Sequence, residues 1–403
     1  MSVPSLSILM ITEADPVHLE GGAERVVQEE SRHLLAQGHA VTVLTRRAHD
    51  SFPLEESIGG VHVARYPAPA GKSPAALSAT MRSCQAVLSG LMARQKFDVA
   101  NVMQPIGGAA ALPVLRRQGL PVIYTFLSPW SQEYVARQTR RRHDLVGRAW
   151  TRLNSAARQR IERNVLRGCA AVRTLSGFSI TQLEEIHGFN REQATVIPGG
   201  VDVQRFCLQE RDKTRLGLGL PRSPVLLTVR NLEPRMGIDL LLDAMPAVLR
   251  EHPDVTLLIG GSGPLRQKLE EQIAALNLAQ NVRMLGYVSE EELPRYYGCV
   301  DAFVIPTRSL EGFGLVTVEA LACGTPVLGT PIGSTPEILG QLDPRLLFRD
   351  ATPPAIAEGL NRWLLEGRSW CSPSQCRTLV EREYTWPGNV TRLVDLYRRV
   401  IQP

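Results

Sequence analysis

The sequence predicts an α/β protein of two domains, each with a parallel β-sheet covered by helices. Short apolar runs of strand length alternate with longer helical patterns along the chain, which is typical of parallel sheets with helical crossovers. This alternation occurs twice, on either side of a segment rich in proline and glycine. The 403 residues, 44% of them hydrophobic and 21% charged, are enough for two globular domains of ordinary size.

Strands and helices can be assigned in chain order from these patterns. The expected strands of the first half are residues 7–12, 40–45, 61–66, 99–103, 122–126 and 170–174. Those of the second half are residues 225–229, 256–259, 283–285, 302–306 and 327–329. A helix over 23–37 ends at Gly38, the residue type favoured just after a helix.

The domain boundaries follow from breaker residues and from the tail. Residues 198–224 contain several prolines and glycines and are expected to connect the domains. Residues 386–401 have the apolar spacing of an amphipathic helix. We therefore predict a first domain over 1–205, completed by the tail 386–403, and a second domain over 206–385.

The segment 302–326 is the most informative part of the sequence. Residues 302–306 read as a buried strand, the glycines around Phe313 as a turn, and 315–323 as a helix ended by Gly324. The start of such a helix leaves N–H groups that can donate to a phosphate. Glu311 lies beside this anion site and Glu319 lies in the helix. A nucleotide sugar suits this pattern, because its diphosphate fits the helix start and its hydroxyls fit the carboxylates.

These motifs resemble those of a known enzyme family. Glu311 begins Glu-Gly-Phe-Gly, and Glu319 begins Glu-Ala-x-Ala-x-Gly-x-Pro-Val. Together with Gly-Gly-Ala-Glu-Arg at 21–25, Val-Ile-Pro-Gly-Gly-Val-Asp at 196–202 and Gly-Gly-Ser-Gly-Pro at 260–264, they resemble the family 4 retaining glycosyltransferases over nearly the whole chain. The resemblance implies the GT-B fold, in which two Rossmann-like domains face each other across a cleft and the C-terminal helix crosses back to the first domain.

The resemblance also implies a reaction and a set of site residues. It implies a retaining hexosyltransferase whose second domain binds a nucleoside-diphosphate sugar and whose first domain binds the acceptor. Glu311 is the expected catalytic residue and contacts the hexose, Glu319 holds the ribose, and the amides of Leu315 and Val316 hold the diphosphate. The expected donor-binding residues are Gly22, Arg230, Arg235, Gly263, Tyr287, Val288, Gly312, Phe313, Gly314, Leu315, Val316 and Glu319.

The sequence departs from the family pattern in three places. Asn231 and Met236 stand where the family has the arginine and the lysine that bind the diphosphate, and each follows an arginine, Arg230 or Arg235. We expect Arg235 to be the better substitute, because a shift of one residue in a strand turns a side chain to the opposite face. Leu127 stands where the family commonly has a histidine near the sugar.

These departures leave an alternative function open. Without the usual histidine, arginine and lysine, the protein could be a degenerate glycosyltransferase that acts as a binding or scaffold protein. A nucleotide-sugar epimerase with the same fold is a further reading, although it does not explain the Glu-Gly-Phe-Gly block. No Asp-x-Asp pair occurs, so we expect no metal ion and no cofactor, and the leaving-group charge must be met by amides and basic side chains.

Charge and composition limit which partners and which cellular location are expected for the protein. Ten arginines lie between Arg137 and Arg167 against Asp144 and Glu162. One reading is a helix whose apolar face packs on its own domain; the other is a basic face that contacts anionic lipid or a phosphorylated acceptor. No apolar run reaches about 18 residues, the start does not resemble a signal peptide, and the seven cysteines lack metal-ligand spacing. We expect a cytoplasmic protein, peripheral at the inner membrane surface, that does not bind nucleic acid.

Overall fold

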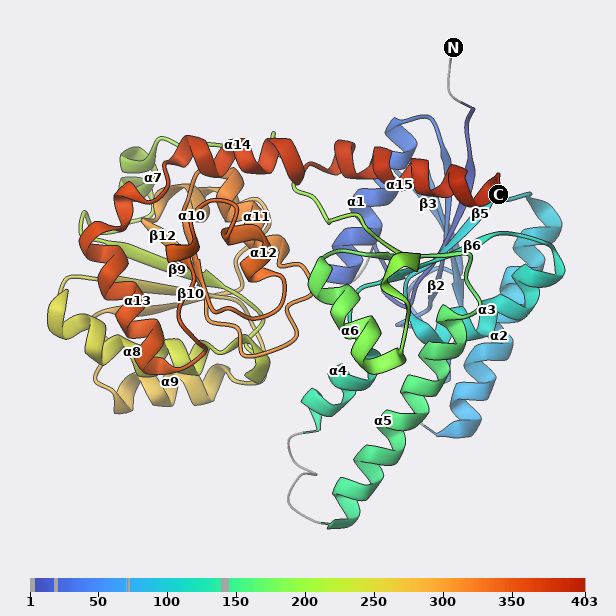
Figure 1. Cartoon of the computed structure of the whole chain (residues 1–403), viewed down its shortest axis with the longest axis horizontal. Helices are drawn as coiled ribbons and strands as arrows, with labels where there is room; N and C mark the ends of the chain where they lie inside the picture. The colour runs from blue at the N-terminus through green and yellow to red at the C-terminus, as the bar shows by residue number, and fades with distance from the viewer. Residues whose placement is uncertain (1–3, 18–20, 70, 72, 139–144, 403) are drawn as a thin grey trace. The chain divides into compact units, whose positions relative to one another are not determined.

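The computed structural model describes residues 4–17, 21–69, 71, 73–138 and 145–402 and divides the chain into two compact units (Figure 1). Unit 1 comprises the chain up to Pro198 and from Trp386 onwards, and unit 2 comprises Gly199–Thr385. The sequence-based boundary was set between residues 205 and 206. Each unit contains a β-sheet and helices, so the predicted α/β class with two parallel-sheet domains is confirmed.

The sheet of unit 1 has eight strands among the described residues, in the order β3-β4-β2-β1-β5-β6-β7-β8. The strands are β1 Ser7–Ile11, β2 Ala40–Arg46, β3 Glu55–Ile58, β4 Val61–Tyr66, β5 Val99–Val102, β6 Val122–Phe126, β7 Ala171–Thr174 and β8 Ala194–Val196. Only β3 runs antiparallel to its neighbour, β4. The apolar strand β1 lies in the middle, paired with β2 and β5, and is almost entirely buried.

Helices pack around this sheet and complete the core. They are α1 Gly22–Ala36, α2 Pro74–Arg94, α3 Pro105–Arg117, α4 Trp130–Arg137, α5 Leu145–Leu166, α6 Gly177–His187, the short 3₁₀ turn Arg191–Gln193 and α15 Trp386–Ile401. Helix α15 belongs to unit 1 although it ends the chain, as predicted. It buries Leu393, and the Tyr397 hydroxyl accepts a hydrogen bond of 2.8 Å from the Asn101 amide of β5.

The sheet of unit 2 has five parallel strands in the order β11-β10-β9-β12-β13. They are β9 Val225–Val229, β10 Thr256–Gly260, β11 Val282–Gly286, β12 Ala302–Ile305 and β13 Val327–Gly329. The helices are α7 Arg211–Gly217, α8 Ile238–Glu251, α9 Arg266–Ala275, α10 Leu293–Cys299, α11 Leu315–Ala322, α12 Thr335–Leu339, α13 Pro353–Glu366 and α14 Pro373–Glu383. Short 3₁₀ turns occur at Pro234–Met236, Pro344–Leu346 and Gly367–Ser369.

Only part of the apolar face of helix α5 packs on its own domain. Its C-terminal half does so, since Val165 is 1% exposed. Its N-terminal half does not: Leu153 is 64% exposed, and Ala149 and Ala157 are exposed as well. Figure 1 shows this half of α5 extending away from the sheet of unit 1. In the described part of the chain, no helix is long and apolar enough to cross a membrane.

Candidate functional site

The loop between β12 and α11 has the predicted strand–turn–helix geometry. Helix α11 starts at Leu315, directly after Gly314, which has a φ of +77°. A Cβ atom on Gly314 would lie 2.9 Å from the Thr317 hydroxyl, so a side chain there would be both strained and crowded. Because glycine has no side chain to cap the helix, α11 begins without a carboxylate or hydroxyl from its own N-cap residue.

Glu311 is held firmly beside this helix start. Its side chain is only 9% exposed. One carboxylate oxygen, Oε2, accepts a hydrogen bond of 3.0 Å from the Thr307 hydroxyl and also forms an ion pair with the Arg230 guanidinium. The Glu311 carbonyl accepts a hydrogen bond of 3.0 Å from the Ser334 amide. Both the backbone and the carboxylate of Glu311 are therefore fixed by neighbouring loops of unit 2.

Arg230 lies closer to Glu311 than strand alternation predicts. It follows Val229, the last residue of β9, so the alternating pattern of the strand no longer fixes the direction of its side chain. The guanidinium is almost fully buried and lies 2.9 Å from the sulfur of Met236. The methionine that replaces the family lysine is thus in contact with an arginine, which puts a positive charge next to the altered position.

Arg235 approaches the same loop from another direction. It lies in the 3₁₀ turn Pro234–Met236, and one guanidinium nitrogen donates a hydrogen bond of 3.1 Å to the Leu310 carbonyl. Leu310 itself has a φ of +60°, a conformation that is unfavourable for a leucine. The two arginines therefore hold adjacent residues of the loop, Arg230 through a side chain and Arg235 through the backbone, whereas Asn231 is exposed.

Glu319 is buried within α11 and has a different partner. It is 2% exposed, and its carboxylate accepts a hydrogen bond of 3.1 Å from the hydroxyl of Tyr297, a fully buried residue of α10. The sequence analysis did not single out Tyr297. A tyrosine in a short helix before a strand carries no recognisable signal, so only the packing of α10 on α11 reveals this contact.

The other expected donor-binding residues of unit 2 follow neighbouring strands. Gly263 comes after β10 with a φ of +153°, and a Cβ atom there would meet the backbone of Leu232 at 2.7–2.9 Å. Tyr287 and Val288 follow β11; Tyr287 is 57% exposed and Val288 is buried. The carboxyl ends of parallel strands meet at one edge of a sheet, so these segments lie on the same edge as Arg230 and Glu311.

Phe313, by contrast, packs into the interior of unit 2. It is 5% exposed, and its ring centroid lies 5.8 Å from that of Tyr384. Its side chain therefore anchors the loop, and the neighbouring glycines, Gly312 and Gly314, leave the backbone as the part that can approach a ligand.

The expected residues of unit 1 lie at chain segments that follow its strands. Gly22 is the first residue of α1 and is exposed, with open space where a Cβ atom would be. Leu127 follows β6 and is half-buried. His18 precedes the Gly-Gly motif at 21–22 and is the histidine nearest to it in the sequence; it lies outside the described residues.

Glu13 is a residue of unit 1 that the sequence analysis missed. It follows β1, and its Oε1 accepts hydrogen bonds of 3.1 and 3.2 Å from the amides of Ile106 and Gly107 at the start of α3. Gln104 accepts 2.7 Å hydrogen bonds from the Thr12 hydroxyl and the Glu13 amide. Burial raises the pKa of the Glu13 carboxyl above its ordinary value, and the two amides and Arg46 oppose the rise. The strand order changes direction between β1 and β5, which is where such sheets bind ligands.

Two family models match the sequence of the chain. The description "Glycosyl transferases group 1" matches residues 210–383, which lie in unit 2, and "Glycosyltransferase Family 4" matches residues 20–205. Together they cover both units in the expected order. The chain is a family 4, group 1 glycosyltransferase.

Similar proteins agree with this assignment. A D-inositol 3-phosphate glycosyltransferase from Nocardiopsis dassonvillei is 29% identical to this glycosyltransferase over 95% of this chain and 90% of its own length. A GDP-mannose-dependent alpha-(1-6)-phosphatidylinositol monomannoside mannosyltransferase from Mycolicibacterium smegmatis is 36% identical over 35% of this chain and 39% of its own. The structure of a sucrose-phosphate synthase from Thermosynechococcus elongatus, 22% identical, superposes with a TM-score of 0.82 over 98% of this chain and 99% of its own.

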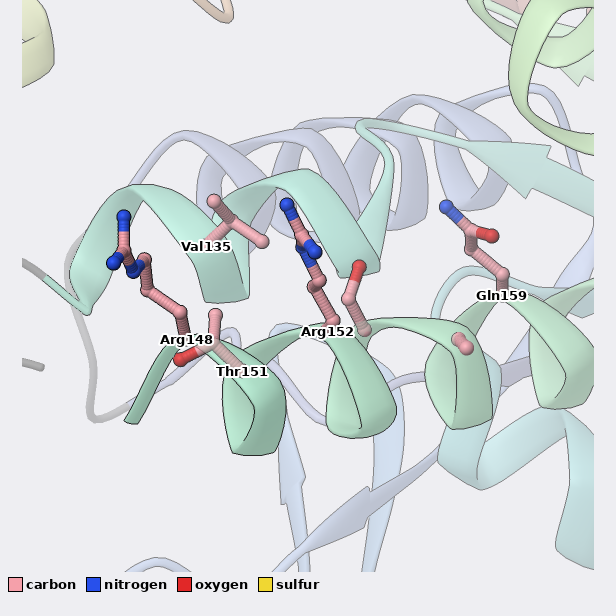
Figure 2. A pocket seen from close by; sticks show the side chains of 7 residues that line it. Val135, Arg148, Thr151, Arg152 and Gln159 are labelled. Atoms are coloured by element: carbon pink, nitrogen blue, oxygen red, sulfur yellow. The ribbon is translucent and has the colours of Figure 1, made fainter. Parts of the chain in front are cut away.

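These similarities settle the class of the protein. The fold is GT-B, and the protein is a glycosyltransferase enzyme; the reading as a degenerate scaffold is not favoured. Two cavities in the described residues lie elsewhere, both in unit 1. One, of about 420 Å³, is between α4 and α5 (Figure 2), and one of about 510 Å³ is lined by the ends of α5 and α6 and the start of β7. Neither cavity is lined by the expected donor-binding residues, which are brought together by the hydrogen bonds and the strand order described for unit 2.

Proposed function

We propose that this glycosyltransferase moves a hexosyl group from a nucleoside-diphosphate sugar to an acceptor hydroxyl with retention of anomeric configuration, without a metal ion or cofactor. The observation that carries the proposal is the buried ion pair between Arg230 and Glu311 beside the uncapped start of α11. A carboxylate next to a diphosphate is unfavourable by itself. The guanidinium of Arg230 removes this difficulty, because it compensates the charge of Glu311 where the diphosphate would bind.

The parts of the donor can be allotted to specific groups. The diphosphate accepts hydrogen bonds from the amides of Leu315 and Val316, where the helix dipole also favours negative charge. Arg230 and Arg235 supply the positive charge that Met236 and Asn231 lack. Glu311 binds a hydroxyl of the hexose, and Glu319 accepts from the ribose.

The reaction then follows from where charge develops. The bond between the anomeric carbon and the diphosphate oxygen breaks, and a bond forms between that carbon and the acceptor oxygen on the same face of the sugar. The acceptor proton passes to an oxygen of the leaving diphosphate, so this chain needs no separate base in place of the missing histidine at Leu127. The negative charge on the leaving group is stabilised by the α11 amides and the arginines, which are preorganised by the loop contacts described above.

Similar proteins support a nucleotide-sugar donor without identifying the nucleotide. The Mycolicibacterium smegmatis relative is described as GDP-mannose-dependent, and a structural neighbour from Anabaena was solved with UDP. The bases differ, and Tyr287 and Val288 would meet the base through main-chain atoms that any sequence provides. We therefore propose the class of donor and not its base or sugar.

The test is a panel of UDP-, GDP- and ADP-sugars. We expect one member of the panel to stabilise the protein against heat and to be hydrolysed slowly by it. We also expect transfer of its sugar to inositol or a simple sugar, with the product anomer assigned by NMR. Activity should persist in excess EDTA. If no sugar nucleotide stabilises the protein or is hydrolysed, the proposed donor site is wrong; an inverted product would refute retention alone.

We also propose that the acceptor is a sugar, a small polyol or a lipid-linked molecule, and that the enzyme works in the cytoplasm in peripheral contact with the membrane. The names of the two relatives include an inositol phosphate and a phosphatidylinositol mannoside. The arginine-rich stretch around α5 supports membrane contact. Product formation with a phosphatidylinositol acceptor in vesicles but not with soluble inositol would favour the lipid-linked alternative.

A further inference from the structure

Tyr297 is a fully buried residue of α10 whose hydroxyl contacts the carboxylate that is expected to hold the ribose. It donates a hydrogen bond of 3.1 Å to Oε2 of Glu319 in α11. Tyr297 is 0% exposed and Glu319 is 2% exposed. A buried carboxylate needs hydrogen-bond donors, so stability alone could account for this contact. The other contacts of Tyr297 and the position of Glu319 point to a further role in donor recognition.

The tyrosine is held in place by contacts that do not involve Glu319. Its ring packs edge-to-face against Phe303 of β12, with the ring centroids 5.2 Å apart, and its centroid lies 6.1 Å from that of Phe206. Its carbonyl accepts a hydrogen bond of 2.5 Å from the hydroxyl of Thr325, in the turn between α11 and β13. Both the ring and the backbone of Tyr297 are therefore fixed, and the position of its hydroxyl oxygen is fixed with them.

The carboxylate of Glu319, by contrast, has no strong rotational preference of its own. The last torsion of a glutamate joins an sp³ carbon to an sp² carbon and has only broad minima. A donor at a fixed position therefore decides in which directions the two carboxylate oxygens point. Tyr297 occupies one of the roughly four acceptor positions of a carboxylate. Because its hydroxyl is neutral, the carboxylate keeps its negative charge, which strengthens a hydrogen bond donated by a ligand hydroxyl.

The position of Glu319 along α11 suits a ribose. It follows Leu315 by one turn of the helix, about 6 Å. In a nucleotide the ribose is attached directly to the diphosphate, for which we propose the amides at the helix start. Glu311, beside that start, is instead paired with the Arg230 guanidinium. A cation thus accompanies the carboxylate near the proposed phosphate site, and a neutral hydroxyl accompanies the carboxylate one turn further on.

We propose that Tyr297 is a positioning residue, through which the enzyme selects ribonucleoside-diphosphate sugars against their 2′-deoxy counterparts. This inference rests on the proposed function, in which Glu319 accepts from the ribose. The 2′ and 3′ hydroxyls lie side by side on one face of the ribose, so a correctly turned carboxylate accepts from both. A deoxyribose donates only once and leaves a desolvated carboxylate oxygen without that hydrogen bond. Sugars carried on deoxythymidine diphosphate are therefore the class of donor that this site rejects.

Nucleoside diphosphates are the probes for this selection, because they contain the ribose without the transferred sugar. Calorimetric titration of the full chain with UDP, GDP and ADP, each against its 2′-deoxy form, measures the preference for ribose. We expect the parent to bind the ribose form of its nucleotide roughly tenfold to hundredfold more tightly, as for a hydrogen bond to a charged group. Deoxythymidine-diphosphate glucose should accordingly compete poorly with the active sugar nucleotide.

Tyr297→Phe removes the hydroxyl and keeps the ring that packs on Phe303. The preference for ribose should fall roughly twofold to tenfold, the net effect of one neutral hydrogen bond. In hydrolysis of the active sugar nucleotide, KM should rise while kcat stays near the parent value, because the ribose takes no part in bond breaking. Tyr296→Phe, at the neighbouring half-buried tyrosine of α10, is the matched control and should keep the full preference.

A double-mutant comparison separates positioning from a general effect on stability. Glu319→Gln should already have a weak preference for ribose. Adding Tyr297→Phe to it should lower the preference no further, because the tyrosine acts through Glu319. Thermal unfolding of each variant measures the stability separately. The comparison of ribose with deoxyribose in the parent needs no variant, so it tests the proposal even if a substitution prevents folding.

Several outcomes would overturn the proposal. These are an unchanged preference in Tyr297→Phe, an equal loss in Tyr296→Phe, or a further loss in the double variant. A parent that binds the ribose and deoxyribose forms equally would also overturn it, and would leave the diphosphate part of the donor site in place. If no nucleoside diphosphate and no sugar nucleotide binds, the donor proposal itself fails, so the two failures are distinguishable.

Discussion

The starts of helices α11 and α3 occupy similar positions, but only the first amides of α3 donate hydrogen bonds to a carboxylate of the protein. Each follows a strand of a parallel sheet, at the edge where α/β proteins bind ligands. In unit 2, α11 starts after Gly314 and its own N-cap offers no side chain. In unit 1, the Glu13 carboxylate already accepts from the first amides of α3.

This difference indicates which part of the substrates each edge can receive. The open start of α11, with Arg230 close to it, suits the diphosphate of a donor. The filled start of α3 does not suit a phosphate; it leaves carboxylate and amide groups, Glu13 and Gln104, that suit hydroxyls. The contrast supports the proposal that unit 2 recognises the phosphate, and we propose that this edge of unit 1 recognises hydroxyls.

Removing Arg230 should have the largest effect. Arg230→Ala leaves Glu311 buried without its charge partner, which typically costs about 3–5 kcal/mol of stability. Donor affinity should fall roughly tenfold to hundredfold, because a charge-assisted hydrogen bond contributes about 1.5–3 kcal/mol. Calorimetric titration with the active sugar nucleotide measures the affinity, and thermal unfolding measures the stability.

Arg230→Met/Glu311→Gln is the matched variant for this experiment. It removes both charges, so stability should recover toward that of the parent while donor binding stays weak. Parent-like donor affinity in Arg230→Ala would show that Arg235 alone meets the diphosphate, as the sequence pattern first suggested.

A side chain at Gly314 should close the open helix start. Gly314→Ala places a Cβ atom at a positive φ and 2.9 Å from Thr317 Oγ1, at a cost of roughly 1–2 kcal/mol. We expect about tenfold weaker donor binding because the α11 amides shift. Gly188→Ala is the control: its φ is +61° with open space around it, so it adds backbone strain in unit 1 and should leave donor affinity unchanged. Equal losses of donor affinity in both variants would argue against a local effect.

Removing the Glu13 carboxylate should leave the first amides of α3 available to an anion, as we propose for those of α11. Glu13→Ala frees the amides of Ile106 and Gly107, so we expect it to bind inorganic phosphate weakly, detectable by chemical-shift changes of these amides in NMR. Glu13→Gln keeps an accepting oxygen and should not gain phosphate binding. Stability should fall by about 1 kcal/mol in Glu13→Ala, the usual effect of losing a helix cap. Phosphate binding by the parent as strong as by Glu13→Ala would refute the contrast.

The pH dependence of stability gives the smallest and most specific signal. Burial raises the pKa of Glu13 in the folded protein. The stability linked to this shift is complete below the ordinary glutamate pKa and is lost as pH rises through the raised value. The melting temperature of the parent should therefore fall relative to that of Glu13→Gln across this window. A constant difference between the two over the whole range would mean that Glu13 titrates normally.

Much of the fold was predictable because most strands are apolar and long enough to recognise. The strands β1, β2, β4, β5, β6 and β7 of unit 1 and all five of unit 2 correspond to apolar runs in the sequence. Strands β3 and β8 were not predicted. Glu55–Ile58 is mostly exposed and Ala194–Val196 is three residues long, so their pairing depends on neighbours and not on their own hydrophobicity.

The candidate site was predictable only in part. Its motif residues could be named because glycines and glutamates at fixed spacing leave a trace in the sequence. Tyr297 and Glu13 left none, because a hydrogen bond between distant elements depends on how those elements pack. Of the two readings of α5, packing on its own domain holds for the C-terminal half and not for the N-terminal half, since an apolar period shows which side of a helix is apolar but not whether anything covers it.

The sequence alone determined the α/β class, the two-domain order and the pairing of Glu311 and Glu319 around a helix start, because these rest on local periodicity and on turn residues. Tertiary structure alone decided that Arg230 reaches Glu311, that Glu13 fills the start of α3 and that Trp150 remains exposed. The physical reason is the same in each case. The direction of a side chain beyond the end of a strand, and the cover over a helix face, are set by contacts between residues far apart in the chain.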